Sequence, residues 1–149
     1  MVRLMLISCS SRKSSEAGAI SALERYQGTT YRVIKKAKRE GYWPENTHLF
    51  IVSAKYGLIS EHYPIEFYDL KMTKNLAVER CAEISSALDK LINENIYSKI
   101  FVNMGETYMR SVQSSSELIH ARRDGIVQEA SGGIGNRLKQ TKDWLLSQR

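Results

Sequence analysis

Short apolar runs that each end abruptly in polar residues dominate the pattern of this chain. Three such runs, rich in β-branched residues, cover residues 2–7, 48–52 and 99–102. Small and functional side chains follow each run at once, and stretches of helical composition separate the runs. This alternation is typical of parallel strands joined by helices. We therefore predict an α/β fold with three layers, in which helices flank a mostly parallel central sheet.

The spacing of apolar residues predicts the elements between these strands. Thr29 or Thr30 is placed to cap a helix that Gly41 ends, and Thr73 or Asn75 is placed to open a long helix. The predicted helices span residues 16–26, about 30–40, about 73–95, 106–119 and 136–146, and the fourth of them has a weak middle at 114–116. Residues 59–72 are expected to be irregular. Residues 126–127 are expected to form a last short strand.

The length of 149 residues fits one domain over residues 1–149. No apolar stretch approaches the ~20 residues of a membrane span, and the N-terminus lacks a signal-peptide pattern, so a cytoplasmic location is expected. The two cysteines, Cys9 and Cys81, lack the spacing of a zinc site, and Cys81 falls on the apolar stripe of a predicted helix. We expect no disulfide, no metal and no cofactor, and the sequence leaves the oligomeric state open.

A net charge of +6 favours polyanionic partners such as nucleic acid. The positive residues form two groups, one in the predicted helix over residues 30–40 and one towards the C-terminus. Each group is interpreted either as a surface for an anionic partner or as a solvated helix face.

The loop that follows the first predicted strand, residues 8–13, offers hydroxyl groups, backbone N–H groups and two cations. Ser8, Ser10 and Lys13 are candidates to bind an anion. Cys9 is a candidate nucleophile, because a neighbouring cation lowers the pKa of a thiol. The alternative is that Cys9 is a small buried residue at the end of a strand.

The second strand runs into Ser53, Lys55, Tyr56 and Gly57, which we predict to bind a ligand. A lysine directly after a buried strand needs solvent, a carboxylate or an anionic ligand, because an unpaired buried charge is costly. The alternative is a turn with a lysine that reaches solvent.

An aromatic segment follows, in which Tyr68 is a candidate to stack on a nucleobase, and such stacking contributes ~1–3 kcal/mol per base. Asp69 is a candidate general base. The alternative for these aromatic residues is packing against the core, which we prefer for Phe67.

The third strand runs into a further polar cluster. Asn103, Gly105 and Tyr108 are candidate ligand-binding residues, because a glycine lets the N-terminus of the following helix approach an anion. Glu106 is either an acid–base group or a carboxylate stabilised by the helix dipole. A glycine-rich loop at residues 132–135 precedes Arg137, and this arrangement is interpreted either as a phosphate site or as a flexible tether.

Six segments occur in a recognisable order: "ISCSSRK" (residues 7–13), "YQGTTYR" (26–32), "SAKYGLI" (53–59), "FYDLKM" (67–72), "VNMGETYMRSV" (102–112) and "GGIGNRL" (132–138). With these segments the chain resembles the YaaA-like proteins, the peroxide-stress YaaA group. The resemblance implies an α/β fold and a link to nucleic acid, because proteins of that type are associated with DNA binding and protection from oxidative damage. A shorter similarity relates the Cys-Ser…Lys block to a domain of archaeosine synthase, which modifies a base in transfer RNA. By this mapping the residues of interest are Ser8, Cys9, Ser10, Lys13, Tyr26, Gly28, Lys55, Tyr56, Tyr68, Gly105, Tyr108 and Arg137.

Three hypotheses follow. The first is a nucleic-acid-associated domain that holds DNA, RNA, a nucleotide or a nucleobase in a pocket at the carboxyl edge of the sheet, with Lys13, Lys55 and Arg137 on phosphate. The second is an enzyme, either a nucleobase transferase or an N-glycosidic-bond hydrolase, that uses Cys9, Asp69 or Glu106. The third is a protein-interaction module without catalytic activity.

Overall fold

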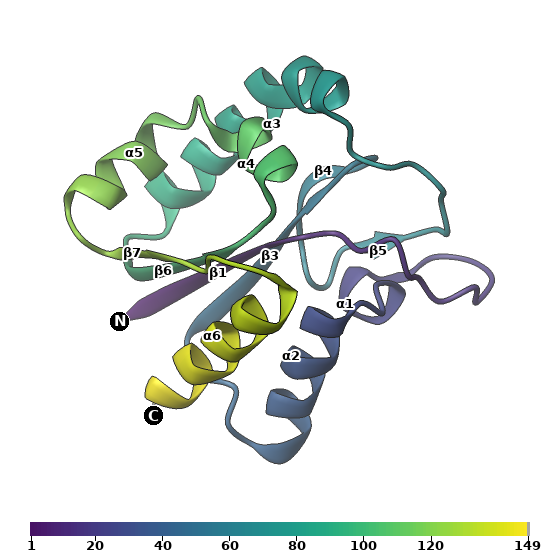
Figure 1. The fold of residues 1–149 in the computed structure, drawn as a ribbon, viewed down its shortest axis with the longest axis horizontal. Helices are drawn as coiled ribbons and strands as arrows, with labels where there is room; N and C mark the ends of the chain where they lie inside the picture. The colour runs from purple at the N-terminus through teal and green to yellow at the C-terminus, as the bar shows by residue number, and fades with distance from the viewer. Residues whose placement is uncertain (149) are drawn as a thin grey trace.

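A five-stranded sheet in the order β4-β3-β1-β6-β7 forms the centre of the molecule, which a computed structural model describes over residues 1–148 (Figure 1). The strands are β1 (Val2–Ser8), β3 (Thr47–Ser53), β4 (Gly57–Ser60), β6 (Tyr97–Asn103) and β7 (Val127–Glu129). β1 pairs in parallel with β3 and β6, β6 pairs in parallel with β7, and β4 is antiparallel to β3. The predicted α/β class and the mostly parallel sheet are confirmed.

Helices cover both faces of this sheet and make the predicted three layers (Figure 1). α2 (Thr29–Glu40) and α6 (Ile134–Ser147) lie together on one face. α3 (Lys74–Glu94), α4 (Glu106–Val112) and α5 (Ser116–Arg123) lie on the other. β1 is buried on both faces, and all four residues from Leu4 to Ile7 are almost inaccessible to solvent. The near-continuous apolar run in the sequence reflects this position, because central parallel strands are buried on both faces.

The chain leaves β1 and β6 towards opposite faces of the sheet. β1 leads to α2 on one face, whereas β6, its direct neighbour, leads to α4 on the other. In open α/β sheets, a crevice forms outside the carboxyl ends of two neighbouring strands whose connections diverge in this way, and ligands bind there. The topology therefore marks the β1–β6 edge as the place to search for a site.

Several local predictions are confirmed. Gly41 ends α2 in the left-handed conformation, with φ of 83°. The Thr73 side chain accepts a hydrogen bond from the N–H of Leu76 and caps α3, and Cys81 is buried on that helix. The weak middle of the predicted helix 106–119 is a break between α4 and α5.

The prediction of a helix over residues 16–26 is wrong, because only α1 (Ala22–Arg25) is helical there. The guanidinium of Arg25, which is completely buried, donates hydrogen bonds to the carbonyl oxygens of Ser14, Glu16 and Gly18 and to that of Ile65. These carbonyl groups are therefore turned towards Arg25 and not along a helix axis. Residue 20 begins β2 (Ile20–Ser21), which pairs with β5 (Pro64–Ile65).

Two further predictions need correction. Neither Thr29 nor Thr30 caps α2, since Gly28 occupies the N-cap position. The stretch 59–72, expected to be irregular, contains half of β4 and all of β5. The β-strand content was hidden because these strands are only four and two residues long.

Within residues 1–148, no helix is long and apolar enough to cross a membrane. The same residues contain no group of three or more His, Cys, Asp or Glu side chains that could hold a metal ion.

Candidate functional site

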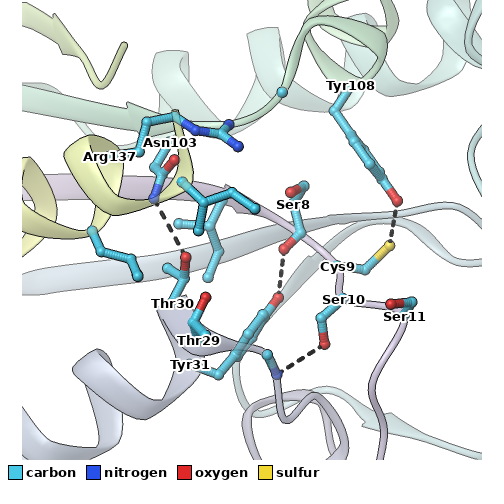
Figure 2. A pocket seen from close by; sticks show the side chains of 15 residues that line it. Ser8, Cys9, Ser10, Ser11, Thr29, Thr30, Tyr31, Asn103, Tyr108 and Arg137 are labelled. Carbon is cyan, nitrogen blue, oxygen red and sulfur yellow. Dashed lines mark hydrogen bonds between the residues drawn. The ribbon is translucent and has the colours of Figure 1, made fainter. Parts of the chain in front are cut away.

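A cavity of about 310 Å³ opens at the carboxyl ends of β1 and β6 (Figure 2). Four segments that are distant in the sequence line it: the end of β1 with its loop, the start of α2, the segment from β6 into α4, and the first turn of α6. The lining residues are Ile7, Ser8, Cys9, Ser10, Ser11, Gly28, Thr29, Thr30, Tyr31, Asn103, Gly105, Tyr108, Ile134, Arg137 and Leu138. The cavity thus occupies the crevice that the topology marks.

The helices that meet at this cavity begin in a different way from the other helices. α2, α4 and α6 have glycine at the N-cap, respectively Gly28, Gly105 and Gly133, and no side chain caps them. By contrast, α1, α3 and α5 are capped by the hydroxyl groups of Ser21, Thr73 and Ser115. The first N–H groups of a helix have no partner within the helix. The two longer helices of the first set, α2 and α6, therefore present uncapped N–H groups and the positive ends of their dipoles to the cavity.

Gly28 brings the start of α2 against the loop after β1. Its N–H donates a hydrogen bond of 3.2 Å to Ser10 Oγ, and Ser10 Oγ in turn donates to the carbonyl oxygen of Arg12 at 2.7 Å. A Cβ atom on Gly28 would lie 2.8 Å from Ser10 Cβ, which is shorter than the contact distance between two carbon atoms that are not bonded to each other. Only glycine allows this contact, so Gly28 sets the width of the cavity on this side.

Two further hydrogen bonds fix the walls. Tyr31 donates its hydroxyl hydrogen to the carbonyl oxygen of Ser8 at 2.8 Å, which ties α2 to the end of β1 (Figure 2). The Asn103 amide donates to Thr30 Oγ1 at 3.5 Å and to Thr141 Oγ1 at 3.1 Å, so it joins α2 to α6. Asn103 is 6% exposed. Asn103 thus ties the start of α2 to the middle of α6.

Arg137 is the cation of the cavity, and no carboxylate lines it. The side chain extends from α6 across the cavity, and its Nη1 atom lies 3.8 Å from the position that a Cβ atom would take on Gly105 (Figure 2). The Nε atom of Arg137 is buried and has no hydrogen-bond partner among the described residues. Because a guanidinium only donates hydrogen bonds and no carboxylate lines the cavity, the positive charge of Arg137 favours an anionic ligand there.

Cys9 and Tyr108 close the opposite end. The Cys9 sulfur and the Tyr108 hydroxyl oxygen lie 3.0 Å apart (Figure 2). Burial, followed by the neighbouring Cys9, raises the pKa of Tyr108 well above its ordinary value. The phenol therefore stays protonated at neutral pH and is available as a hydrogen-bond donor.

The sequence matches the model of a family of unknown function, DUF6884, over residues 4–143. The chain belongs to that family. No curated protein matches the sequence. Among solved structures, the chain is similar to AF0587, a protein of unknown function, with a TM-score of 0.55 and 12% sequence identity. The match covers 96% of this chain and 44% of that one, so the chain spans less than half the length of its structural neighbour. This likeness shows a shared fold, and neither comparison bears on the resemblance to YaaA-like proteins, which stays a prediction.

The structure brings about half of the predicted site residues to the cavity. They come from the clusters after the first and third predicted strands, from the start of α2 and from the glycine-rich loop: Ser8, Cys9, Ser10, Gly28, Asn103, Gly105, Tyr108 and Arg137.

Other predicted residues form a second group, which we call the tyrosine cluster: Tyr26, Ser53, Tyr68, Lys13 and Lys55. The hydroxyl groups of Tyr26 and Tyr68 are 2.7 Å apart, and Ser53 Oγ lies 3.1 Å from the first and 3.0 Å from the second. Lys13 Nζ lies 4.5 Å and Lys55 Nζ 6.0 Å from the centre of the Tyr68 ring. The ring of Tyr68 is only 6% exposed, so it is packed against its neighbours and does not offer a face for base stacking.

Four predicted residues belong to neither group, although Tyr56 packs against the tyrosine cluster, with its ring centre 5.6 Å from that of Tyr68. The Tyr56 N–H donates to Ser53 Oγ, and Gly57 adopts a φ of 76° at the start of β4 beside Arg80. Asp69 is exposed and does not line the cavity. Glu106 is 87% exposed at its side chain and lies 3.6 Å from Arg110 on the same helix. Neither carboxylate lines the cavity that holds Cys9, and an acid–base role for either stays a prediction.

Seven lining residues were not among the predicted site residues: Ile7, Ser11, Thr29, Thr30, Tyr31, Ile134 and Leu138. A usable signal was present in the sequence, because Gly28, Gly105 and Gly133 each stand directly before a helix. The residues that follow such a glycine present their backbone to a ligand, whichever side chains they carry.

Proposed function

We propose that the cavity binds a nucleotide, either free or as part of a nucleic acid, and that the protein is a nucleic-acid-associated domain. This proposal rests mainly on the guanidinium of Arg137, which shares the cavity with no carboxylate and lies beside the uncapped N-termini of α2 and α6. Helix N-termini bind phosphate through N–H groups and the dipole, and a guanidinium adds a bidentate contact. The net charge of +6 attracts polyanionic ligands to the molecule.

The rest of the cavity suits the nucleoside part. Its volume lies within the ~300–1,000 Å³ that is typical of ligand pockets. Hydroxyl groups from Ser8, Ser11 and Thr29 can pair with those of a sugar, whereas Ile134 and Leu138 offer apolar surface to a base. The absence of carboxylates from the lining removes a source of repulsion for phosphate.

The test is isothermal titration calorimetry with AMP, GMP, CMP, UMP and inorganic phosphate as probes. We expect at least one nucleotide to bind more tightly than phosphate, and Arg137→Ala to weaken that binding. The matched control is Lys139→Ala, which removes an equal charge from an exposed position of the same helix. Equal affinity of the two variants, or no binding by the wild type, would contradict the proposal and would favour a protein-interaction module.

Catalysis on a nucleobase or its glycosidic bond is the second candidate. The position of the Cys9 thiol inside the cavity, in contact with the Tyr108 hydroxyl, favours it. Cys81 is the internal reference for accessibility, because the two cysteines are 9% and 8% exposed. Burial raises the pKa of the Cys81 thiol, but hydrogen bonds with Ser114 and Ser85 outweigh this and lower it, so Cys81 is a demanding standard for a reactive Cys9. A nucleophilic Cys9 should react with iodoacetamide at neutral pH much faster than Cys81, and a bound nucleotide should slow only the reaction of Cys9. Equally slow labelling of both thiols would count against a cysteine mechanism.

A further inference from the structure

A small basic groove lies beside the cavity. It has a volume of about 190 Å³ and is lined by Arg12, Gln27, Arg32 and Lys35. Three of these four residues are cations, and no carboxylate lines the groove. Among residues 1–148, the guanidinium groups of Arg12 and Arg32 have no hydrogen-bond or ion-pair partner. The ammonium of Lys35 donates to the carbonyl oxygen of Tyr26 at 3.2 Å, which keeps its charge at the groove.

The groove and the cavity share two chain segments. Ser10 and Ser11 line the cavity and Arg12 lines the groove, whereas Gln27 lines the groove and Gly28 the cavity. The N–H of Gln27 donates to the carbonyl oxygen of Arg12 at 2.9 Å, so the two segments are held together at the boundary. The two sites are therefore adjacent, and a ligand that fills the cavity lies next to the groove.

We propose that the groove binds the phosphate of a neighbouring nucleotide, so that the ligand is a nucleic-acid strand with one nucleotide seated in the cavity. This inference rests on the proposed function. A nucleoside monophosphate has one phosphate and can satisfy only one of the two positive sites, whereas a strand carries a phosphate for each nucleotide. Three cations without a counter-charge match such a backbone, because contacts to phosphate supply most of the sequence-independent affinity for nucleic acid.

The test compares a 5′-phosphorylated dinucleotide with the matching mononucleotide by calorimetry at low and moderate salt. We expect the wild type to bind the dinucleotide about tenfold more tightly or better, since charge-assisted contacts of this kind are worth at least that factor. The gain should shrink as the salt concentration rises, because counterions compete for the same phosphate contacts.

The variant Arg32→Ala/Lys35→Ala should abolish this gain and leave mononucleotide binding unchanged. The matched control is Lys36→Ala/Arg39→Ala, which removes the same charge from exposed positions of the same helix outside the groove. Because Lys35 also bonds to Tyr26, the single variant Arg32→Ala is tested in parallel and should lose a large part of the gain.

The outcomes separate the two proposals. A mononucleotide that binds in an Arg137-dependent way, together with a dinucleotide that binds no more tightly, overturns the strand proposal and leaves the cavity proposal intact. The strand proposal is also overturned if the control pair loses the gain equally, or if a nucleoside triphosphate gains as much as the dinucleotide. If neither the mononucleotide nor the dinucleotide binds, both proposals are overturned.

Discussion

The cavity and the tyrosine cluster differ in whether their polar groups already have partners. Both lie near the carboxyl edge of the sheet, and both collect residues that the sequence offers as ligand-binding candidates. In the tyrosine cluster, the three hydroxyl groups of Tyr26, Ser53 and Tyr68 bond to one another within 2.7–3.1 Å. In the cavity, the Nε atom of Arg137 has no hydrogen-bond partner among the described residues, and no side-chain cap closes the N-terminus of α2.

This difference separates support from recognition. A satisfied polar network has no bonding capacity left for a ligand, and its main effect is to hold the surrounding elements in one arrangement. An unpaired donor at an open cavity gains a partner only when a ligand arrives, so binding free energy is available there. Substitutions in the tyrosine cluster should therefore change stability, whereas substitutions in the cavity should change affinity.

The largest expected effect is a loss of stability in alkaline solution. Burial raises the pKa of Tyr26 to about 12 and that of Tyr97 to about 12, and it raises the pKa of Tyr31 and Tyr68 further. A tyrosine ionises near pH 10 in the unfolded chain. The stabilising contribution is therefore complete below pH 10 and is lost between pH 10 and 12, at up to ~1.4 kcal/mol per pH unit for each tyrosine. Urea unfolding between pH 8 and 11.5 measures the slope, and a free energy of unfolding that stays constant above pH 10 would contradict the buried tyrosines.

Tyr26→Phe should come next, with a loss of about 1–3 kcal/mol of unfolding free energy, because Tyr68 and Ser53 each lose a buried partner. Nucleotide affinity should not change. Tyr63→Phe is the control, since Tyr63 is 49% exposed and this substitution should change the free energy of unfolding by no more than ±0.5 kcal/mol. Chemical denaturation and calorimetry measure the two quantities, and a large drop in affinity for Tyr26→Phe would merge the two regions into one site.

Arg137→Lys should show the opposite pattern. The charge is kept, but the planar fork of the guanidinium is lost, so we expect nucleotide affinity to fall about tenfold, which is ~1.4 kcal/mol. Stability should stay within ±0.5 kcal/mol, because Arg137 Nε has no partner to lose. Affinity equal to that of the wild type would mean that Arg137 acts only as a point charge.

The smallest effect is expected for Lys55→Ala. Lys55 is exposed and does not line the cavity. Exposed charges contribute little, so both stability and nucleotide affinity should change by less than ~0.5 kcal/mol. Thermal unfolding and calorimetry test this expectation, and a clear loss of affinity would extend the binding surface to the tyrosine cluster.

The sequence predicts the main elements well because their signals are local. Apolar runs mark β1, β3 and β6, and the caps at Thr73 and Gly41 depend on residues within one helical turn. The false helix at residues 16–26 shows the limit. Arg25 turns the carbonyl groups of this loop towards its guanidinium, and a bond to Ile65, 40 positions away, holds the guanidinium in place. No pattern within the segment itself encodes such a partner.

About half of the predicted site residues line the cavity, because the sequence marks the ends of strands but not the order of the strands in the sheet. The rule that ligands gather at the carboxyl ends of strands selects the ends of β1, β3 and β6 without distinction. The order β4-β3-β1-β6-β7 places the β3 end on the far side of β1 from the cavity. Lys55 and Tyr56 follow β3 and are therefore separated from Asn103 and Arg137. Strand order is a property of the whole fold, so the choice between the two edges required the structure.

The buried guanidinium of Arg25 has a consequence for how this protein tolerates change. All its acceptors are main-chain carbonyl oxygens, which every amino acid supplies. The side chains of Ser14 and Glu16 can thus be exchanged without loss of the bonds to Arg25, although Ser14 Oγ also accepts a hydrogen bond from the N–H of Glu16. Arg25 cannot be replaced by lysine, because a lysine has three donors on one atom and cannot span the same carbonyl groups. One side chain thus fixes the path of residues 14–18 through main-chain atoms alone.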